Sequence, residues 1–204
     1  MTTLFDPEAM AATTAAGPPA YTRHGNPRYR VAGLDISLTG TGIATLGGTT
    51  LITSTGRRKD SVLQRRTRLK GIADEILTAV GTVHLAVIEG PSHHSVGGSV
   101  WDRGGLWWLV VDRLCDRGIA VAVMPPMSRA KYATGNGGSR KAAVLDAAQK
   151  RYGAILPNDN EADALVLRAA GLDWLGQPLA EVPDGHRAAL AGCQWPDREQ
   201  VTVR

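Results

Sequence analysis

The fold of this chain is decided by one stretch of sequence, Val31-Ala32-Gly33-Leu34-Asp35-Ile36-Ser37-Leu38-Thr39-Gly40-Thr41-Gly42-Ile43-Ala44. The pattern predicts an apolar strand that carries an acidic residue, a turn of Ser, Thr and Gly residues, and a second apolar strand. Burying the Asp35 carboxylate among Leu34, Ile36 and Leu38 is costly unless an ion pair, hydrogen bonds or a metal ion compensates its charge. The glycines let another backbone, or a phosphate, approach closely. The stretch therefore predicts a buried carboxylate that needs a partner.

Two further acidic residues have similar surroundings. Glu89 ends the apolar run from 84 to 88, and Asp163 lies inside the segment 159–167. Carboxylate oxygens are the hard ligands that Mg²⁺ and Mn²⁺ prefer, and two such ions about 3.5–4 Å apart can promote phosphodiester hydrolysis. We therefore expect Asp35, Glu89 and Asp163 to meet around divalent metal and to cleave nucleic acid.

Each of these acids also has a purely structural interpretation. Glu89 is then a carboxylate that faces solvent where a strand ends. Asp159 or Asn160 is the N-cap of a helix, and Glu161 a residue that interacts with the helix dipole. This interpretation explains Asp163 poorly, because a buried helix favours an apolar side chain at that position.

Size and composition favour one globular domain. A chain of 204 residues with a hydrophobic fraction of 43% can bury a full core. No stretch approaches the roughly 18 apolar residues of a membrane span, and the N-terminus lacks the basic and apolar parts of a secretory signal. Cys115 and Cys193 have no metal-ligand spacing. These features predict a cytoplasmic protein with reduced thiols and no membrane partner.

The net charge of +4 is mild, but it is unevenly distributed. Seven basic residues crowd one segment with only Asp60 among them: Arg57, Arg58, Lys59, Arg65, Arg66, Arg68 and Lys70. Such a cluster is typical of phosphate binding. A solvated helix face explains it equally well.

The order of elements predicts an α/β fold with a five-stranded mixed sheet. Strands are expected at 29–35, 42–46, 51–54, 84–88 and 119–124, the first three as an antiparallel meander around Gly47-Gly48. Helices are expected from a cap at 60 or 61 to 80, from 100 to about 117, at 141–152 and from 157 to 172. Residues 128–140 predict a basic, glycine-bearing loop. A crossover helix makes the first and fourth strands parallel neighbours, which brings Asp35 close to Glu89.

Composition divides the chain into three parts. Residues 1–28 are rich in Ala, Thr, Pro and Gly and predict a flexible arm. Residues 29–175 form the expected domain, and 176–204 form a C-terminal extension with a short helical stretch near 186–190.

Four short motifs follow one another along the domain: Gly33–Gly42, Ala86–Glu89, Tyr132–Gly137 with Lys141 behind it, and Glu161–Leu165. In this order they resemble the RuvC-like Holliday junction resolvases of the RNase H-like superfamily, and most of all the short phage-encoded members. The resemblance spans about 29–172. It implies an RNase H-like fold and a homodimeric, metal-dependent endonuclease that makes paired nicks in four-way DNA junctions.

The resemblance also implies a set of site residues. Asp35, Glu89 and Asp163 correspond to ligands of two Mg²⁺ ions per active site, with Mn²⁺ as a substitute, and Lys141 to a catalytic cation. The family often has a second acid three residues before its last Asp, where this chain has Asn160.

The fourth metal ligand is therefore open. The amide oxygen of Asn160 can ligate a metal, and Asp159 is the alternative. Asn160 and Asp159 lie three and four residues before Asp163, so either can share its helix face.

DNA contacts follow from the same resemblance. Residues expected to bind phosphates near the scissile bond are Arg129, Lys131, Thr134, Arg140 and Lys141. Residues expected to bind the arms of branched DNA are Arg57, Arg58, Lys59, Arg65 and Arg66.

Two sets of ring-bearing residues keep two interpretations each. His93 and His94 stand where bacterial members carry a base-stacking aromatic residue, and they either contact DNA or are exposed loop histidines. Trp101, Trp107 and Trp108 form either a dimer contact, as the resemblance implies, or a base-stacking set.

Three other functions compete with the junction resolvase. A general nuclease for forks and flaps needs the same chemistry. A junction-binding protein without cleavage is suggested by Asn160. A kinase or ATPase of the actin-like superfamily also begins with a strand, an Asp and a Thr/Gly turn, but it needs two such domains, and this chain has room for one.

Overall fold

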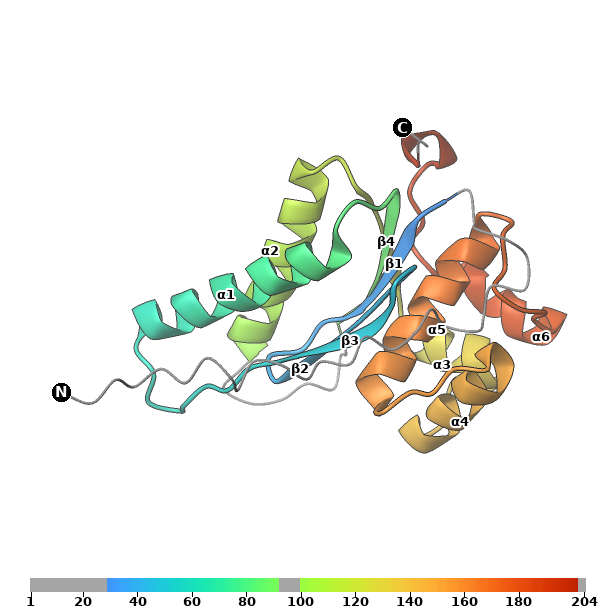
Figure 1. Ribbon diagram of the computed structural model, residues 1–204, viewed down its shortest axis with the longest axis horizontal. Helices are drawn as coiled ribbons and strands as arrows, with labels where there is room; N and C mark the ends of the chain where they lie inside the picture. The colour runs from blue at the N-terminus through green and yellow to red at the C-terminus, as the bar shows by residue number, and fades with distance from the viewer. Residues whose placement is uncertain (1–28, 92–99, 202–204) are drawn as a thin grey trace, which may run out of the picture.

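The computed structural model describes residues 29–91 and 100–201, which build a sheet with helices on both faces (Figure 1). The strands are β1 (Val31–Asp35), β2 (Gly40–Thr45), β3 (Gly48–Thr53), β4 (Leu85–Glu89) and β5 (Ala120–Met124). The helices are α1 (Val62–Val80), α2 (Val100–Asp116), α3 (Pro126–Thr134), α4 (Lys141–Tyr152), α5 (Asp159–Trp174) and α6 (Asp184–Arg187). The predicted arm, 1–28, lies outside the described residues.

The strand order is β3-β2-β1-β4-β5. The β1–β2 and β2–β3 pairs are antiparallel, and the β1–β4 and β4–β5 pairs are parallel. The predicted meander, the five-stranded mixed sheet and the parallel neighbourhood of the first and fourth strands are confirmed.

Side chains alternate between the two faces of the sheet, and each face has its own helices. Leu34 and Ile88 pack with α1 and α2, whereas Val31 and Leu85 pack with α3, α4 and α5. Figure 1 shows α1 and α2 on one side of the sheet and α5 with α3 and α4 on the other. Helix α5 is buried on all sides from Glu161 to Leu172, as expected for a helix in the middle of a core.

Two expectations about helices are wrong. Residues 126–134 form α3 rather than a loop, because Pro126 suits a first helical turn and Gly135 ends the helix in the left-handed conformation, with φ 86°. The spacing of apolar residues along 62–80 predicts one buried face for α1 that begins at Val62, but Val62 is 76% exposed. The buried residues of α1 begin only at Ile72, since the first half of the helix extends beyond the sheet.

The segment after α5 packs against the domain. Trp195 stacks on Trp174 with ring centroids 4.8 Å apart, and Gln194 forms a β-bridge with Val123. Leu179 and Val182 are part of the core on the α5 side. None of the helices in 29–91 and 100–201 is both long and apolar enough to cross a membrane.

Candidate nuclease site

Two of the three predicted acids end neighbouring strands. The register of β1 and β4 pairs Leu34 with Ile88, so the next residues, Asp35 and Glu89, leave the sheet at the same edge. Both strands are buried up to this point because the side chains that precede the two acids are apolar on both faces of the sheet. Trp107 of α2 donates its indole N–H to the Glu89 carbonyl oxygen at 3.0 Å, which fixes the end of β4.

Helix α5 brings the third acid, Asp163, to the same edge. Two glycines of the opening stretch allow this approach: a Cβ atom at Gly33 would lie 2.0 Å from the Ala164 carbonyl oxygen, and one at Gly42 would lie 2.0 Å from the Asn160 carbonyl oxygen. Gly42 pairs with Asp35 across β1 and β2. The first turn of α5 therefore crosses the sheet beside Asp35.

The N-cap of α5 is Asn158, not Asp159 or Asn160. The Asn158 side chain accepts a hydrogen bond from the Glu161 N–H at 3.0 Å and donates one to the Glu161 carboxylate at 2.8 Å. Thr49 of β3 donates to the other oxygen of this buried carboxylate. Because Asn158 takes the cap, Asp159, Asn160 and Asp163 all lie inside the first turns of the helix.

Replacing Asn158 by Ala should lower the free energy of unfolding by about 1–2 kcal/mol, because the helix loses its cap and Glu161 loses a partner. Urea unfolding measures this loss. Asn136→Ala is a suitable control, since that side chain only accepts from Gly138 in an exposed turn. An Asn158 variant as stable as the wild type would contradict the cap assignment.

Arg129 of α3 lies between two of the acids. Its side chain is only 8% exposed; Nε donates to the Glu89 carboxylate and Nη1 donates to the Asp163 carboxylate. A planar guanidinium is well suited to contact two carboxylates at once. The sequence predicted Arg129 as a phosphate contact, and the structure turns its side chain inward instead.

Burial and the charges of neighbouring groups shift the pKa values of the acids of the site. Burial, with the neighbouring charge of Glu89, raises the pKa of Asp35 to about 7, against the opposing effect of Arg129 and Lys141. Burial also raises the pKa of Glu89. A hydrogen bond from Lys141 lowers the pKa of Asp159. Burial thus disfavours the ionised forms of Asp35 and Glu89 unless a cation lies beside them.

The donor set has the chemistry for a hard divalent cation. Asp35, Glu89 and Asp163 offer carboxylate oxygens from three elements, and the burial of Asp35 beside Glu89 favours a cation that compensates their charge. As the side chains stand, no three Asp, Glu, His or Cys residues of the described chain form a group that could hold a metal ion. The guanidinium of Arg129 spans the acids where such a group would form.

Asn160 and Asp159 flank this group. A Cβ atom at Gly40 would lie 2.9 Å from the Asn160 side-chain nitrogen, which places that amide against the start of β2. Asp159 is partly exposed and forms an ion pair with Lys141 at the start of α4. Both remain candidates for the fourth ligand.

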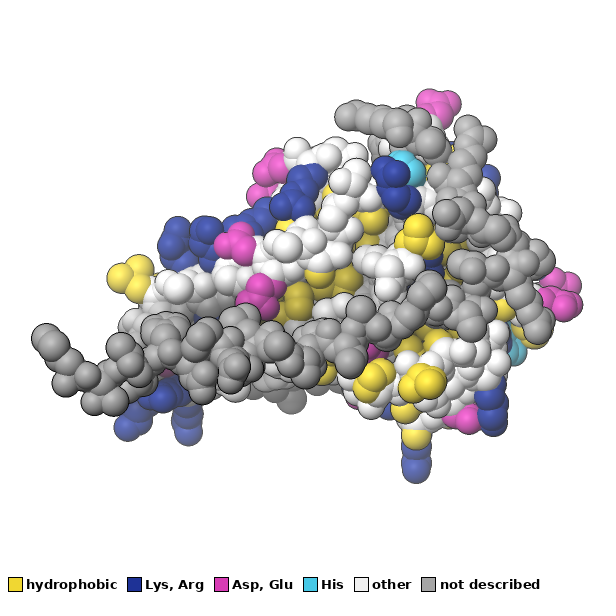
Figure 2. Space-filling model, in the orientation of Figure 1, with side chains coloured by type: hydrophobic (Ala, Val, Ile, Leu, Met, Phe, Trp, Pro, Cys, Tyr) yellow, Lys and Arg dark blue, Asp and Glu magenta, His cyan; other side chains and the backbone are white. Residues whose placement is uncertain are grey.

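The predicted DNA contacts fall into three groups. Exposed residues around the site and the start of α1 are Arg57, Arg58, Lys59, Arg66, Arg140 and Lys141. Lys and Arg side chains gather at the end of the molecule where α1 begins (Figure 2). Arg65 is engaged in an ion pair with Asp102, Lys131 is half-buried, and the Thr134 hydroxyl is hydrogen-bonded within the end of α3. His93 and His94 lie outside the described residues.

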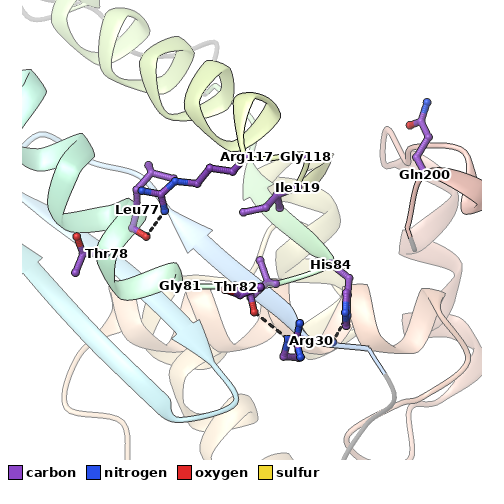
Figure 3. A pocket seen from close by; sticks show the side chains of 11 residues that line it. Arg30, Leu77, Thr78, Gly81, Thr82, His84, Arg117, Gly118, Ile119 and Gln200 are labelled. Atoms are coloured by element: carbon purple, nitrogen blue, oxygen red, sulfur yellow. Dashed lines mark hydrogen bonds between the residues drawn. The ribbon is translucent and has the colours of Figure 1, made fainter. Parts of the chain in front are cut away.

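A cavity of about 570 Å³ lies at the opposite end of the sheet, where β1 and β4 begin (Figure 3). Arg30 donates to the Thr82 carbonyl at 2.9 Å and Arg117 donates to the Leu77 carbonyl at 2.7 Å. These cations satisfy carbonyl groups at and just beyond the end of α1, as basic residues commonly do. No predicted site residue lines this cavity.

Comparison with known proteins addresses the fold. No model of a known protein family matches the sequence, and neither does any curated protein. A structure of Thermus thermophilus RuvC is similar to this chain, with a TM-score of 0.57 and 18% identity over 76% of this chain and 99% of that one. T. thermophilus RuvC in complex with Holliday junction substrate is similar with the same TM-score and coverage, at 19% identity. The chain therefore has the RuvC fold, an RNase H-like α/β architecture.

Proposed function

We propose that this protein is a Mg²⁺-dependent endonuclease that resolves four-way DNA junctions by paired nicks during recombination or replication, in the cytoplasm. The observation that carries the proposal is the meeting of Asp35, Glu89 and Asp163 at one edge of the sheet. A RuvC of the same fold is known in complex with Holliday junction substrate, which supports branched DNA as the substrate class.

The three carboxylates would hold the metal ions, with Asn160 or Asp159 completing the set. Bound Mg²⁺, or Mn²⁺ in its place, would supply an activated water and stabilise the leaving oxygen. The burial of Asp163 and the indole contact that fixes the Glu89 backbone would keep the ligands in a fixed geometry. Lys141, which pairs with Asp159 at the rim, would bind a phosphate near the scissile bond.

The remaining cations suit the arms of a branched substrate. Arg57, Arg58 and Lys59 are exposed between β3 and α1, where a phosphate backbone can reach them. Arg140 is exposed before α4. Contacts of this kind position a duplex without reading its sequence, so we expect selectivity to come from the shape of the junction.

A homodimer is the assembly that this substrate requires. Two active sites related by a two-fold axis can nick two strands symmetrically. Helix α2 exposes Trp101 and Trp108, at 85% and 66%, whereas Trp107 points inward. The exposed pair supports α2 as the dimer contact.

Cleavage of a labelled four-way junction, compared with a linear duplex of the same sequence, tests the function. We expect paired nicks on the junction alone, present with Mg²⁺ and absent with EDTA or in Glu89→Gln. Cutting of forks and flaps as well would replace the resolvase with a general nuclease for branched DNA. Tight junction binding without cleavage in Mg²⁺ or Mn²⁺ would establish the non-cleaving alternative.

A further inference from the structure

The candidate metal site contains its own cation. The Arg129 guanidinium donates through Nε to Oε2 of Glu89 and through Nη1 to Oδ1 of Asp163. The side chains of the three residues are 8%, 16% and 3% exposed, so water can do little to solvate their charges. A buried cation of this kind depends on its carboxylate partners, and the carboxylates depend equally on the cation.

We propose that Arg129 is a built-in counter-ion that occupies the metal position in the metal-free protein and withdraws when a divalent ion binds. The proposal rests on the proposed function, since it takes Glu89 and Asp163 as metal ligands. It assigns to Arg129 a regulatory role at the site in place of the phosphate contact expected from the sequence.

The physical argument is competition for the same oxygens. A carboxylate oxygen that accepts an N–H bond from a guanidinium presents that cation to any approaching metal, and two cations at one carboxylate repel each other. Metal binding is therefore an exchange rather than an addition. The apparent affinity for the metal is then the intrinsic affinity multiplied by the fraction of the protein from which Arg129 has withdrawn.

Other cations near the site do not perform this role. Lys141 is paired with Asp159 at the rim, and its side chain is 66% exposed. Arg129, in contrast, bridges two of the predicted ligands, Glu89 and Asp163. Its position follows from α3, which begins directly after β5 and lies beside α5.

Calorimetric titration with Mn²⁺, in the absence of DNA, tests the exchange. Asp35→Asn removes one of the proposed ligands, so the Mn²⁺ binding that it loses is the binding at this site. Arg129→Ala should bind Mn²⁺ roughly 10-fold more tightly than the wild type, because no competing cation remains. Arg129→Lys keeps the charge but lacks the planar fork that reaches both carboxylates, so its affinity for Mn²⁺ should lie between those of Arg129→Ala and the wild type.

Arg187→Ala is the matched control. Arg187 pairs with Asp173, which lies on the same helix as Asp163 but away from the site. This variant removes a guanidinium from a carboxylate of α5 and should leave the Mn²⁺ affinity unchanged.

A second measurement follows the wild-type protein and uses Arg129→Lys, which keeps the charge, only to identify a signal. The Arg129 Nε–H gives a side-chain NMR signal that Arg129→Lys lacks and thereby identifies. Adding Mg²⁺ should move this signal towards the position of a solvent-exposed arginine, since Nε loses its bond to Glu89.

The outcomes separate the two proposals. The exchange is overturned if Arg129→Ala binds Mn²⁺ no more tightly than the wild type, if Arg129→Lys equals the wild type, or if Mg²⁺ leaves the Nε–H signal in place. Equal Mn²⁺ binding by the wild type and Asp35→Asn would instead overturn the metal site, and the proposed function with it.

Discussion

Asp35→Asn should reduce junction cleavage by at least about 10³-fold while junction binding is kept, because an amide cannot supply the negative charge that holds a catalytic metal. Binding should persist since the exposed cations that we propose to contact DNA are unchanged. Single-turnover kinetics measure cleavage, and a gel shift in Ca²⁺ measures binding. Residual cleavage within tenfold of the wild type would remove Asp35 from the metal site.

The same variant should be more stable than the wild type when metal is absent. The fold raises the pKa of Asp35 to about 7 from its usual 3.8, so the folded protein disfavours the ionised form. This penalty is absent below about pH 4, grows as the pH rises and is fully present above about pH 7. Asn cannot ionise, so Asp35→Asn should gain roughly 1–2 kcal/mol at pH 8 in EDTA and little at pH 4.

Asp146→Asn is the control for both effects. Asp146 forms an exposed ion pair with Lys150 on α4, and removing it should change stability by less than about 0.5 kcal/mol at either pH. Loss of activity together with a gain of stability at high pH in Asp35→Asn alone would show that burying the ionised Asp35 carboxylate costs stability that a bound metal can restore.

Gly33→Ala should destabilise the protein by about 3 kcal/mol or more, which is at the upper end for overpacking. The added methyl group would lie 2.0 Å from the Ala164 carbonyl oxygen and 2.4 Å from the Arg168 nitrogen. Both atoms belong to the backbone of α5, so a side-chain rotation cannot relieve the contact. Helix α5 must move away from β1, and Asp163 moves with it, so cleavage should fall as well.

Gly71→Ala is the matched control, in a helix instead of a sheet. A Cβ atom at Gly71 meets nothing within 4 Å, and alanine favours the helical backbone, so this variant should gain about 0.5–1 kcal/mol. Urea unfolding compares the two. A Gly33 variant that loses less than about 1 kcal/mol would mean that α5 packs more loosely on β1 than the structure indicates.

The sheet could be predicted from the sequence because its signals are local. The apolar run before Glu89 gave β4 within one residue, and the Gly47-Gly48 pair gave the β2–β3 hairpin. The parallel pairing of β1 and β4 followed from the helix between them. The parallel pairing of these two strands then brings Asp35 beside Glu89.

Helix α3 and the start of α5 were harder to predict. Between Pro126 and Gly135 the basic residues and the following glycines suggested a loop, although Pro at the start and Gly at the end favour a helix. At the start of α5 several residues in a row can cap a helix. The choice of Asn158 depends on Glu161, whose burial against Thr49 is a long-range contact.

The inward direction of Arg129 could not be predicted. Spacing along the chain places a basic residue on an element, but it does not say which face of the element meets the carboxylates. That face is set by the packing of α3 against α5 and by the position of β5 beside β4. The same holds for Trp107, whose contact with the Glu89 carbonyl needs α2 in place.

The burial of α5 on every side has a consequence for how this protein can change. In many enzymes the reactive groups sit on loops that can be exchanged while the scaffold persists. Here Asp163 belongs to the helix that fills the centre of the core, and the residues that follow it, from Ala164 to Leu172, are all buried. A mutation that shifts this helix alters the position of Asp163 and the fold together. Exposed cations such as Arg57 and Arg140 can therefore change without disturbing the fold, but the carboxylate cluster cannot be rebuilt without rebuilding the core.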